Sequence, residues 1–406
     1  MARFGSKPPG GRANERRSKV HTRREFAILA SAGALAGCSA TTGGGAAASL
    51  LIPSPPTPPR RTRLALTPVA VAPERVIRTV TGLRPFRPAG FVVRAEPLGD
   101  KRLVHNYGHG GGGVTLSWGT SDMAVRLGHR PDVRDYAVLG CGAVGLATAR
   151  LLQRRGGRVT IYARELPPET TSNIAGAQWW PTSLFDRSAV TPEFMRDYAL
   201  AAHLSYRHFQ NLVGAHYGVR WTRNYIIGNR ALSDYPAGPD DPLRSIAPEL
   251  RDLAPGEHPF DAAYVRQWDT MMVEPPVYLQ AMVEDFLSAG GTVSVRAFAD
   301  RSEVAALPER VVFNCTGLGA RALFGDEALV PVKGQLVVLL PQAEVNYNLL
   351  NDGLYMFPRA DGIMLGGTFE RGNWSLDPDP ADTARILAGH RAIFDAMDNS
   401  RVRRPV

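Results

Sequence analysis

The sequence predicts a fold of the α/β class, built on a parallel sheet and accompanied by a second, α+β domain. The chain has 406 residues, enough for two domains with a large core. Residues 136–152 read YAVLGCGAVGLATARLL, an apolar run that passes through a glycine-rich turn into a helical pattern. A second strand pattern, VTIYARE, follows at residues 159–165. This alternation of strand and helix is typical of a parallel sheet.

The turn in the first stretch fits the pattern GxGxxG in the strand–turn–helix setting that gives this motif its meaning. Gly140 permits the tight turn, Gly142 lets the backbone approach a pyrophosphate, and Gly145 lets the helix pack against the strand. The pyrophosphate would lie with Ala143 and Val144 at the helix N-terminus, where free N–H groups favour an anion. The motif predicts a Rossmann-type dinucleotide site, and a glycine turn in an unrelated α/β unit is the alternative.

The net charge of +9 is concentrated at the N-terminus. Eight basic and two acidic residues precede Cys38, which leaves only +3 for the rest of the chain, so nucleic-acid binding has little support. Arg23 and Arg24, followed by the apolar run AILASAGALAG, resemble a twin-arginine export signal. The sequence LAGC resembles a lipobox that would acylate Cys38, with cleavage near residues 46–48 as the alternative. We expect export to the periplasm or cell envelope, with membrane attachment only through this anchor.

Residues 39–65 are rich in Gly, Ala and Pro and have no apolar period, which indicates a flexible tether after the signal of residues 1–38. Apart from Cys38, the cysteines are Cys141 and Cys315, each at the end of a predicted strand. Small residues surround both, which predicts buried thiols rather than a disulfide. No metal site is predicted, because the histidines at 203, 208, 216 and 258 lack ligand spacing.

Two segments before the glycine turn predict further parts of a ligand site. Residues 76–96 alternate as strands, with prolines at the turn between them. Arg84, in a Gly-x-Arg-Pro context, suits bidentate carboxylate binding, and a structural ion pair is the alternative. Residues 104–119 (VHNYGHGGGGVTLSWG) place four glycines before a helix that opens near Thr115. Backbone N–H groups there form a second anion site.

Two anion sites in one chain favour a large cofactor with two acidic ends, such as FAD. Its pyrophosphate would use the first helix, and the N1/O2 edge of its flavin would use the second. His105 and His109 lie in the second loop. We interpret both as hydrogen-bonding or packing residues rather than catalytic groups.

In combination, these stretches resemble the D-amino-acid oxidase family. The resemblance extends over nearly everything after residue 75 and is carried by GLRPFRP, VHNYGHGGGGVTLSWG, the glycine turn, TTSNIAGAQWWP, VFNCTG, KGQ and LYMFPRADGIMLGGTFERGNW. It implies FAD as cofactor and a substrate domain dominated by a mixed or antiparallel sheet. The expected FAD-binding domain comprises residues 94–181 and 289–325, and the substrate domain comprises residues 66–93, 182–288 and 326–406.

The order of these segments differs from the order in that family. Segments that resemble the family's C-terminal part precede the strand that begins its N-terminal part, as in a circular permutation. The join would lie between Thr120 and Asp135, where a helix is expected to end near Gly128 and Pro131. Permutation is tolerated when natural termini lie close together at the surface.

The resemblance also implies a set of cofactor contacts. Small residues from 175 to 178 would run along the flavin face, and Phe298 would contact the adenosine end through its backbone. Trp179 and Trp180, which follow, are predicted as aromatic core, with a position lining the substrate pocket as the less favoured alternative. Beyond the first glycine turn, the implied cofactor residues are Gly110, Gly112, Gly113, Val114, Thr115, Arg164, Glu165, Thr170, Thr171, Ser172, Gly176, Ala177, Gln178, Phe298 and Thr316.

One position departs from the family pattern. Arg164 stands where the family usually has an aspartate that holds the adenosine ribose, and Glu165 follows it. An arginine there is also compatible with a 2′-phosphate and hence with NADP. FAD is preferred, because the second glycine-rich site has no role in an NADP protein.

Three further residues define the implied substrate site. Tyr355, in a Tyr-x-x-Pro context, matches the family's carboxylate-binding tyrosine, and would clamp the carboxylate together with Arg84. The Gly111 carbonyl would accept a hydrogen bond from the amine. Asn351 replaces a lid tyrosine of mammalian members, which implies a more open pocket. Phe369 stands where the D-aspartate oxidase branch has an arginine, which favours neutral D-amino acids.

The implied activity is hydride transfer from the α-carbon of a D-amino acid to flavin N5. The imino acid then hydrolyses to a 2-oxo acid and ammonia, and either O2, giving H2O2, or a membrane electron acceptor reoxidises the flavin. Three alternatives stay open: an FAD-dependent oxidase or dehydrogenase of glycine or a secondary amine, an NADP-dependent dehydrogenase, and a tethered D-amino-acid-binding protein without catalysis. The side-chain preference and the oligomeric state are not determined by the sequence.

Overall fold

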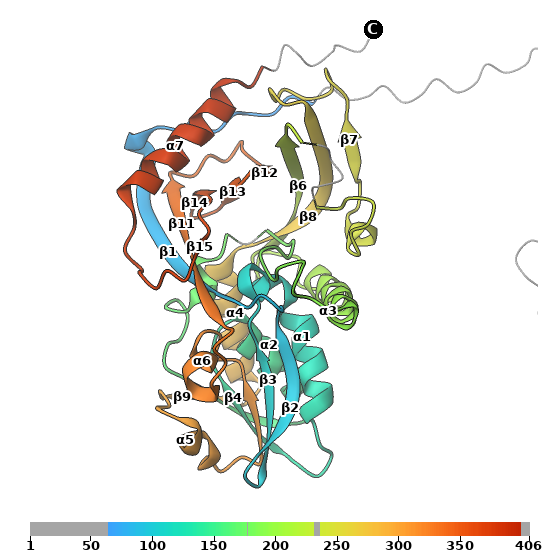
Figure 1. The fold of residues 1–406 in the computed structure, drawn as a ribbon, viewed down its shortest axis with the longest axis vertical. Helices are drawn as coiled ribbons and strands as arrows, with labels where there is room; N and C mark the ends of the chain where they lie inside the picture. The colour runs from blue at the N-terminus through green and yellow to red at the C-terminus, as the bar shows by residue number, and fades with distance from the viewer. Residues whose placement is uncertain (1–63, 177, 231–235, 399–406) are drawn as a thin grey trace, which may run out of the picture. The chain divides into compact units, whose positions relative to one another are not determined.

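The computed structural model describes residues 64–176, 178–230 and 236–398, all within one compact unit. Two sheets organise this unit (Figure 1). The expected export signal, Cys38, nearly all of the tether and Ala177 lie outside the described residues. Among the helices that are described, none is long and apolar enough to cross a membrane.

The first sheet, here the parallel sheet, has six strands in the order β2-β3-β10-β4-β5-β9. All neighbours are parallel except β2 and β3, so the α/β prediction is confirmed. The predicted strand at 159–165 is β5, which is one residue earlier at its start and ends at Ala163. The strand bounds are β2 (Val92–Leu98), β3 (Lys101–Tyr107), β4 (Asp135–Leu139), β5 (Arg158–Ala163), β9 (Thr292–Val295) and β10 (Val311–Asn314).

Helices cover both faces of the parallel sheet because its central strand is apolar on both sides. Tyr136 and Val138 of β4 belong to the core under α1, α2 and α4, whereas Ala137 and Leu139 pack on the side of α5. The helix bounds are α1 (Gly113–Gly128), α2 (Ala143–Arg154), α4 (Pro275–Ser288), α5 (Arg301–Ala305) and α6 (Gly319–Phe324). As predicted, α1 ends at Gly128, and residues 129–134 lead directly into β4.

The second sheet, here the large sheet, has the order β1-β11-β14-β13-β12-β6-β8-β7, with β15 paired to β11. It is antiparallel except for β12 beside β6, which confirms the mixed sheet expected of the second part of the fold. The division into two domains stays a prediction. The bounds are β1 (Val76–Phe86), β6 (Val219–Gly228), β7 (Arg251–Leu253), β8 (Tyr264–Val273), β11 (Val330–Leu339), β12 (Tyr347–Asn351), β13 (Leu354–Arg359), β14 (Gly362–Gly366) and β15 (Glu370–Arg371).

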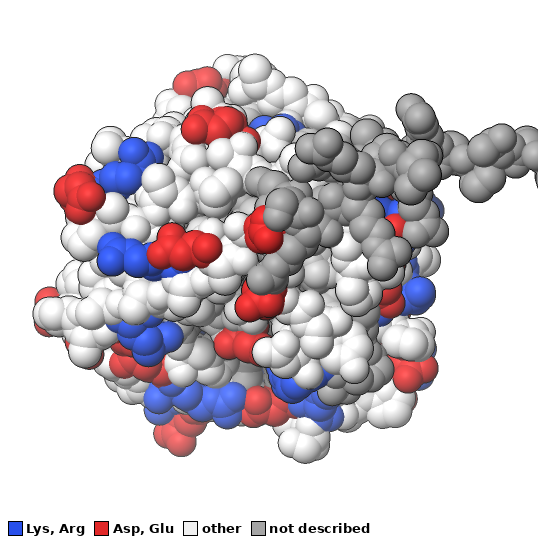
Figure 2. Space-filling view, turned by 90° about the horizontal axis from the view of Figure 1, so that it is seen from above, with Lys and Arg blue, Asp and Glu red and all other residues white. Residues whose placement is uncertain are grey.

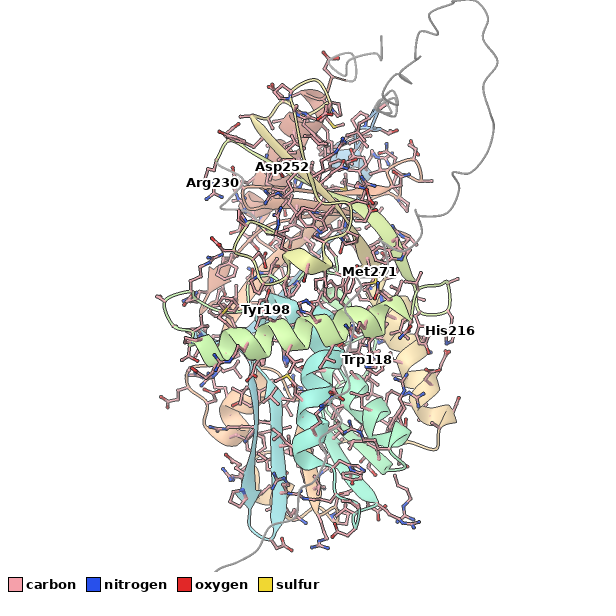
Figure 3. All side chains as sticks on the ribbon, turned by 90° about the vertical axis from the view of Figure 1, so that its right-hand side faces the viewer. Trp118, Tyr198, His216, Arg230, Asp252 and Met271 are labelled. Atoms are coloured by element: carbon pink, nitrogen blue, oxygen red, sulfur yellow. The ribbon has the colours of Figure 1, made fainter. Side chains whose placement is uncertain are left out.

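Two long helices flank the large sheet. In Figure 3, α3 (Pro192–Gln210) lies between the two sheets, and its Tyr198 joins a core that includes Trp268 of β8. Helix α7 (Pro380–Asp395) covers the opposite face through Ile386 and Phe394. Short 3-10 turns occupy Pro73–Arg75, Gly110–Gly112, Thr171–Ile174 and Arg244–Ile246.

The first and last described residues pack together on this outer face. Arg391 of α7 donates from Nε to the Val71 carbonyl at 3.1 Å, and the Tyr347 hydroxyl donates to the Thr67 carbonyl at 2.9 Å. Basic and acidic side chains are interspersed on the face shown in Figure 2. This mixture agrees with the nearly balanced charge that the sequence predicts for the chain after its N-terminal segment.

Candidate active site

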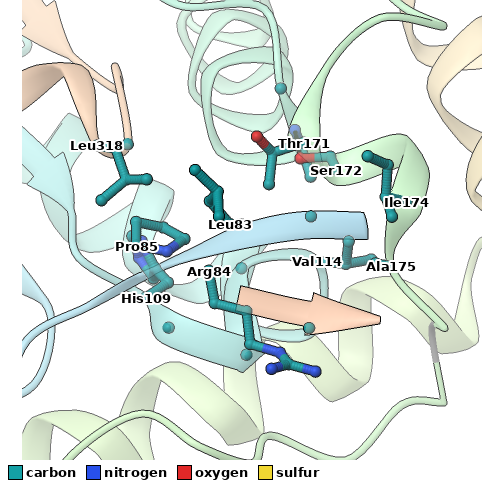
Figure 4. Close-up of a pocket in the computed structure, with 18 of the residues that line it drawn as sticks. Leu83, Arg84, Pro85, His109, Val114, Thr171, Ser172, Ile174, Ala175 and Leu318 are labelled. Atoms are coloured by element: carbon teal, nitrogen blue, oxygen red, sulfur yellow. Dashed lines mark hydrogen bonds between the residues drawn. The ribbon is translucent and has the colours of Figure 1, made fainter. Parts of the chain in front are cut away.

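A cavity of about 1780 Å³ is lined by residues of both sheets. It exceeds the range of about 300–1,000 Å³ that is typical of small-molecule pockets, so it has room for a large cofactor together with a substrate. β1 crosses this cavity (Figure 4). Leu83 points to the side of Thr171 and Ser172, and Arg84 points to the opposite side.

The glycine turn after β4 brings the start of α2 to the cavity. Gly140 has φ of +103°, and a Cβ there would lie 2.6 Å from the Cys315 carbonyl oxygen. A Cβ on Gly145 would overlap the Gly140 carbonyl, so helix and strand pack as the motif predicts. The backbone N–H of Ala143 donates to Ser172 Oγ at 3.1 Å, and the N-cap residue, Gly142, has no side chain that could cap the helix. The helix start therefore presents backbone donors to the cavity.

The four-glycine loop brings a second helix start to the same cavity. Gly110 has φ of +51°, and the Gly111 N–H donates to the Ser183 carbonyl at 3.0 Å. Helix α1 begins at Gly113, two residues before the predicted start, and no side chain caps it. Two helix N-termini, each with a glycine at the N-cap position, thus lie at one cavity, which is the arrangement expected for a ligand with two anionic parts.

Most of the predicted site residues line this cavity. Two do not: Gly145 packs α2 onto β4, and Gly112 faces Leu184, whose side chain a Cβ would meet at 3.1 Å. Ala177 is outside the described residues. The predicted residues that line the cavity are Arg84, Gly110, Gly111, Gly113, Val114, Thr115, Gly140, Gly142, Ala143, Val144, Arg164, Glu165, Thr170, Thr171, Ser172, Gly176, Gln178, Phe298, Thr316 and Tyr355.

Arg164 and Glu165 follow β5 and pair with each other. The Arg164 Nη2 atom lies 2.8 Å from Glu165 Oε1. Both side chains line the cavity, at the end where Phe298 also lies. The carboxylate therefore compensates the guanidinium charge, which weakens the case for a 2′-phosphate beside Arg164.

Arg84 and Tyr355 meet on the cavity face of the large sheet. Arg84 Nη2 donates to the Tyr355 hydroxyl at 3.3 Å, and Nη1 donates to the Thr368 carbonyl at 3.1 Å. A Cβ on Gly334 would overlap the guanidinium, and one on Gly366 would overlap the tyrosine ring. Sequence reasoning missed the roles of Thr368 and the two glycines. A glycine inside a strand signals such close approach, but not which side chain approaches.

Both histidines are hydrogen-bonding and packing residues, as predicted, but only His109 lies in the loop, because His105 belongs to β3. His109 stacks on Phe91, and its Nε2 lies 2.9 Å from Thr120 Oγ1. Complete burial lowers the pKa of His109 to about 3, so the imidazole is neutral. His105 is also buried, with Nδ1 at 3.0 Å from Asn314 Nδ2. Burial lowers the pKa of His105 as well.

Cys141 and Cys315 are free and buried, which confirms the prediction for both thiols. Burial raises the pKa of each to about 12, so both are protonated at neutral pH. Trp179 is core, as predicted. Trp180 packs against Trp268 and also lines the cavity, so the core prediction and its alternative both apply to it. The two neighbouring indoles therefore pack into different clusters: Trp179 contacts Tyr206, and Trp180 contacts Trp268.

The cavity fits FAD in two respects. Glycines whose Cβ atoms would collide with neighbouring backbone lie at both helix starts, so the main chain can approach a phosphate or a ring edge. Ser172, Thr171 and the α2 N-terminus would hold the pyrophosphate, and Gly113 to Thr115 of α1 would hold an anionic ring edge.

Comparisons with known proteins agree with this fit. The family model "DAO: FAD dependent oxidoreductase" matches residues 46–127 and 135–405. The chain is 33% identical to a D-amino-acid oxidase of Streptomyces coelicolor over 67% of its own length and 82% of that protein. It is 30% identical to a D-amino-acid oxidase of Rubrobacter xylanophilus, over 65% of its own length and 78% of that protein. The solved structure of a glycine oxidase of Geobacillus kaustophilus aligns with a TM-score of 0.47 and 17% sequence identity, over 65% of this chain and 80% of that protein. The chain belongs to the DAO family of FAD-dependent oxidoreductases, and FAD is its cofactor.

Proposed function

We propose that this enzyme oxidises neutral D-amino acids to imino acids, which hydrolyse to 2-oxo acids and ammonia. The observation that carries the proposal is the meeting of Arg84 and Tyr355 on the cavity that receives both glycine-rich helix starts. The curated relatives named D-amino-acid oxidase support the same reaction. FAD, when bound, accepts the hydride from the substrate α-carbon.

The substrate carboxylate would bind between Arg84 and Tyr355. A guanidinium is always protonated and offers N–H groups in a planar fork that matches a carboxylate. The Thr368 carbonyl already holds one edge of the Arg84 fork, which limits the orientations that the side chain can adopt. A carboxylate fixed in this way determines which face of the α-carbon meets the cofactor.

The substrate amine would donate to the carbonyl of Gly111, which also lines the cavity. No side-chain base is needed when the amine binds in its neutral form. His109 lies close by in sequence, but it is neutral and its ring is held by Thr120. We therefore assign it no proton transfer.

The side-chain part of the substrate would be uncharged. Phe369 is half-exposed at the cavity and packs edge-on against Phe86, with ring centroids 6.0 Å apart. Ile226 and Leu350 add further apolar lining. Asn351, the last residue of β12, also lines the cavity and is smaller than a lid tyrosine. Together they support neutral substrates and an open entrance.

We further propose that O2 reoxidises the flavin to give H2O2, and that the protein is exported by the twin-arginine route. A membrane electron acceptor is the alternative to O2. Substitution of Arg23 and Arg24 by Lys should retain the protein in the cytoplasm, and Cys38→Ala should abolish labelling by a radioactive fatty acid without affecting export. Export of the double variant would overturn the proposed route.

An anaerobic visible spectrum tests the central proposal. D-Alanine should bleach the flavin absorbance of the holoenzyme and L-alanine should not; air should then restore the absorbance with release of H2O2. Bleaching by glycine or N-methylglycine but not by D-alanine would favour the secondary-amine alternative. A flavin that none of them bleaches would contradict amino-acid oxidation.

A further inference from the structure

Arg359, the last residue of β13, is a buried cation that holds a wall of the cofactor cavity. Only 3% of its side chain is exposed. Its Nε and Nη2 atoms bind the two Asp361 carboxylate oxygens at 2.8 and 2.7 Å, and Nη1 donates to the Ala175 carbonyl at 2.8 Å. Ala175 lies on the cavity. The guanidinium thus joins the large sheet to the cavity lining.

The segment that Arg359 holds, residues 174–176, is here called the cavity strip. It packs closely against two strands of the large sheet, β1 and β13. A Cβ on Gly82 of β1 would meet Ile174 at 3.1 Å, and a Cβ on Gly176 would meet the ring of Phe357 in β13 at 2.7 Å. All three strip residues line the cavity. Any displacement of the strip therefore changes the shape of the cavity itself.

The strip connects the start of α2 to the large sheet along the cavity. Just before it, Ser172 Oγ accepts from the Ala143 N–H at the start of α2. Just after it, Gln178 donates to Asn224 Oδ1 at 2.7 Å on β6. Arg359 is attached between these two contacts, where it limits movement of the backbone between Ser172 and Gln178, both predicted cofactor residues.

A buried guanidinium is costly unless it is paired, and Arg359 is paired on two sides. Asp361 binds it as a fork, and Glu274 Oε2 lies 3.8 Å from its Nε atom. Asp361 also binds Arg78 Nη2 at 2.6 Å, so this carboxylate keeps a cationic partner without Arg359. Because Asp361 binds Nε and Nη2 together, the guanidinium plane is fixed and Nη1 is directed at the Ala175 carbonyl.

We propose that Arg359 is a positioning residue for the cofactor: by fixing the Ala175 carbonyl, it holds the cavity strip in the arrangement that binds FAD. The inference rests on the FAD site and is independent of which amine is oxidised. Arg359 does not line the cavity, so it acts through the strip.

The test compares two buried arginine forks in the same sheet. Arg359→Lys keeps the charge and loses the fork. Arg266→Lys is the matched control, because Arg266 of β8 has 4% of its side chain exposed and binds both Asp252 oxygens, at 2.7 and 3.0 Å. Its Nη1 atom donates to the carbonyl of Pro236, a cavity residue outside the strip, at 3.3 Å. The dissociation constant for FAD is measured from the flavin fluorescence released when holoenzyme is diluted. Thermal unfolding at saturating FAD reports the general loss of stability.

We expect Arg359→Lys to raise the dissociation constant for FAD at least about tenfold, because the loss of a hydrogen bond from a charged donor has a cost of this size. Arg266→Lys should leave that constant within about twofold of wild type at a similar loss of thermal stability. Excess FAD should restore the flavin content and kcat of Arg359→Lys with KM for the amine unchanged.

A second variant keeps the test decisive if Arg359→Lys fails to fold. Arg359→Met removes the buried charge, and Asp361 retains Arg78 as partner. It too should release FAD more readily. Wild-type FAD affinity in Arg359→Lys or Arg359→Met, or equal weakening in Arg266→Lys, would overturn the proposal. Because the readout is flavin release, it stands even if the amine substrate is of another class.

Discussion

The Arg84 guanidinium donates to the Tyr355 hydroxyl at 3.3 Å, although 271 positions separate the two residues in the chain. β1 carries Arg84 and β13 carries Tyr355, with β11 and β14 between them in the large sheet. The two side chains meet because Gly334 of β11 and Gly366 of β14 leave the intervening surface bare. The proposed carboxylate clamp therefore depends on the order of strands in this sheet.

Removal of either half of this clamp should weaken catalysis without loss of flavin. Arg84→Lys should lower kcat/KM for D-alanine by about 100-fold, because a point charge replaces a fork, and Tyr355→Phe by about tenfold. Steady-state kinetics and the flavin spectrum of each variant provide the measurement. Tyr264→Phe, at a half-exposed tyrosine of β8, is the control and should leave both unchanged. Wild-type kinetics in Arg84→Lys would contradict the assigned carboxylate site.

Gly334→Ala should displace the Arg84 side chain and so weaken the proposed clamp. A Cβ at this position would overlap the Arg84 guanidinium, which must then swing away from Tyr355. Misplacement by about 1 Å can cost about 100-fold in rate, so we expect a fall in kcat/KM of up to this size. This loss should appear mainly as a higher KM, and the flavin spectrum should be unchanged. An unaltered KM would show that Arg84 reaches the carboxylate from another direction.

His109 should make the protein less stable in acid. Its pKa is about 3 in the folded protein against an ordinary value of 6.5, so below pH 6.5 the unfolded chain binds a proton that the folded chain does not. Stability is thus lost as the pH falls from 6.5 toward 3, at up to about 1.4 kcal/mol per pH unit from this residue. Urea unfolding at saturating FAD between pH 7 and pH 5 should show a shallower loss for His109→Gln than for wild type. His216→Gln, at an exposed histidine, should keep the wild-type slope.

We propose that the segment order reflects a circular permutation, and the fold should tolerate its reversal. The family match is interrupted between residues 127 and 135, and the first described residues pack on α7 near the last. A variant that begins at Asp135, with residue 398 joined to residue 66 by a flexible linker, should fold and bind FAD. Circular dichroism and flavin content measure this. New termini placed inside β1, between Gly82 and Leu83, should abolish folding, because they divide the strand that carries Arg84.

Local patterns in the sequence sufficed for the parallel sheet and the two helix starts. The GxGxxG turn, the four-glycine loop and the end of α1 at Gly128 each depend on steric and hydrogen-bonding preferences within a few residues. The burial of Cys141 and Cys315 follows from their place at the ends of core strands. The pairing of Arg84 with Tyr355 required the family resemblance in addition, since no local pattern connects two such distant segments.

Tertiary structure alone decided the contacts that depend on strand order and register. The place of Gly334 under the Arg84 guanidinium, the exposure of Trp180 to the cavity and the bond from Arg359 to Ala175 all join segments far apart in the chain. A one-residue slip in the register of β1 or β13 would turn Arg84 or Arg359 to the opposite face of the sheet. Residue types and spacing determined that this chain binds a dinucleotide; the order of strands in the large sheet determined which side chains surround it.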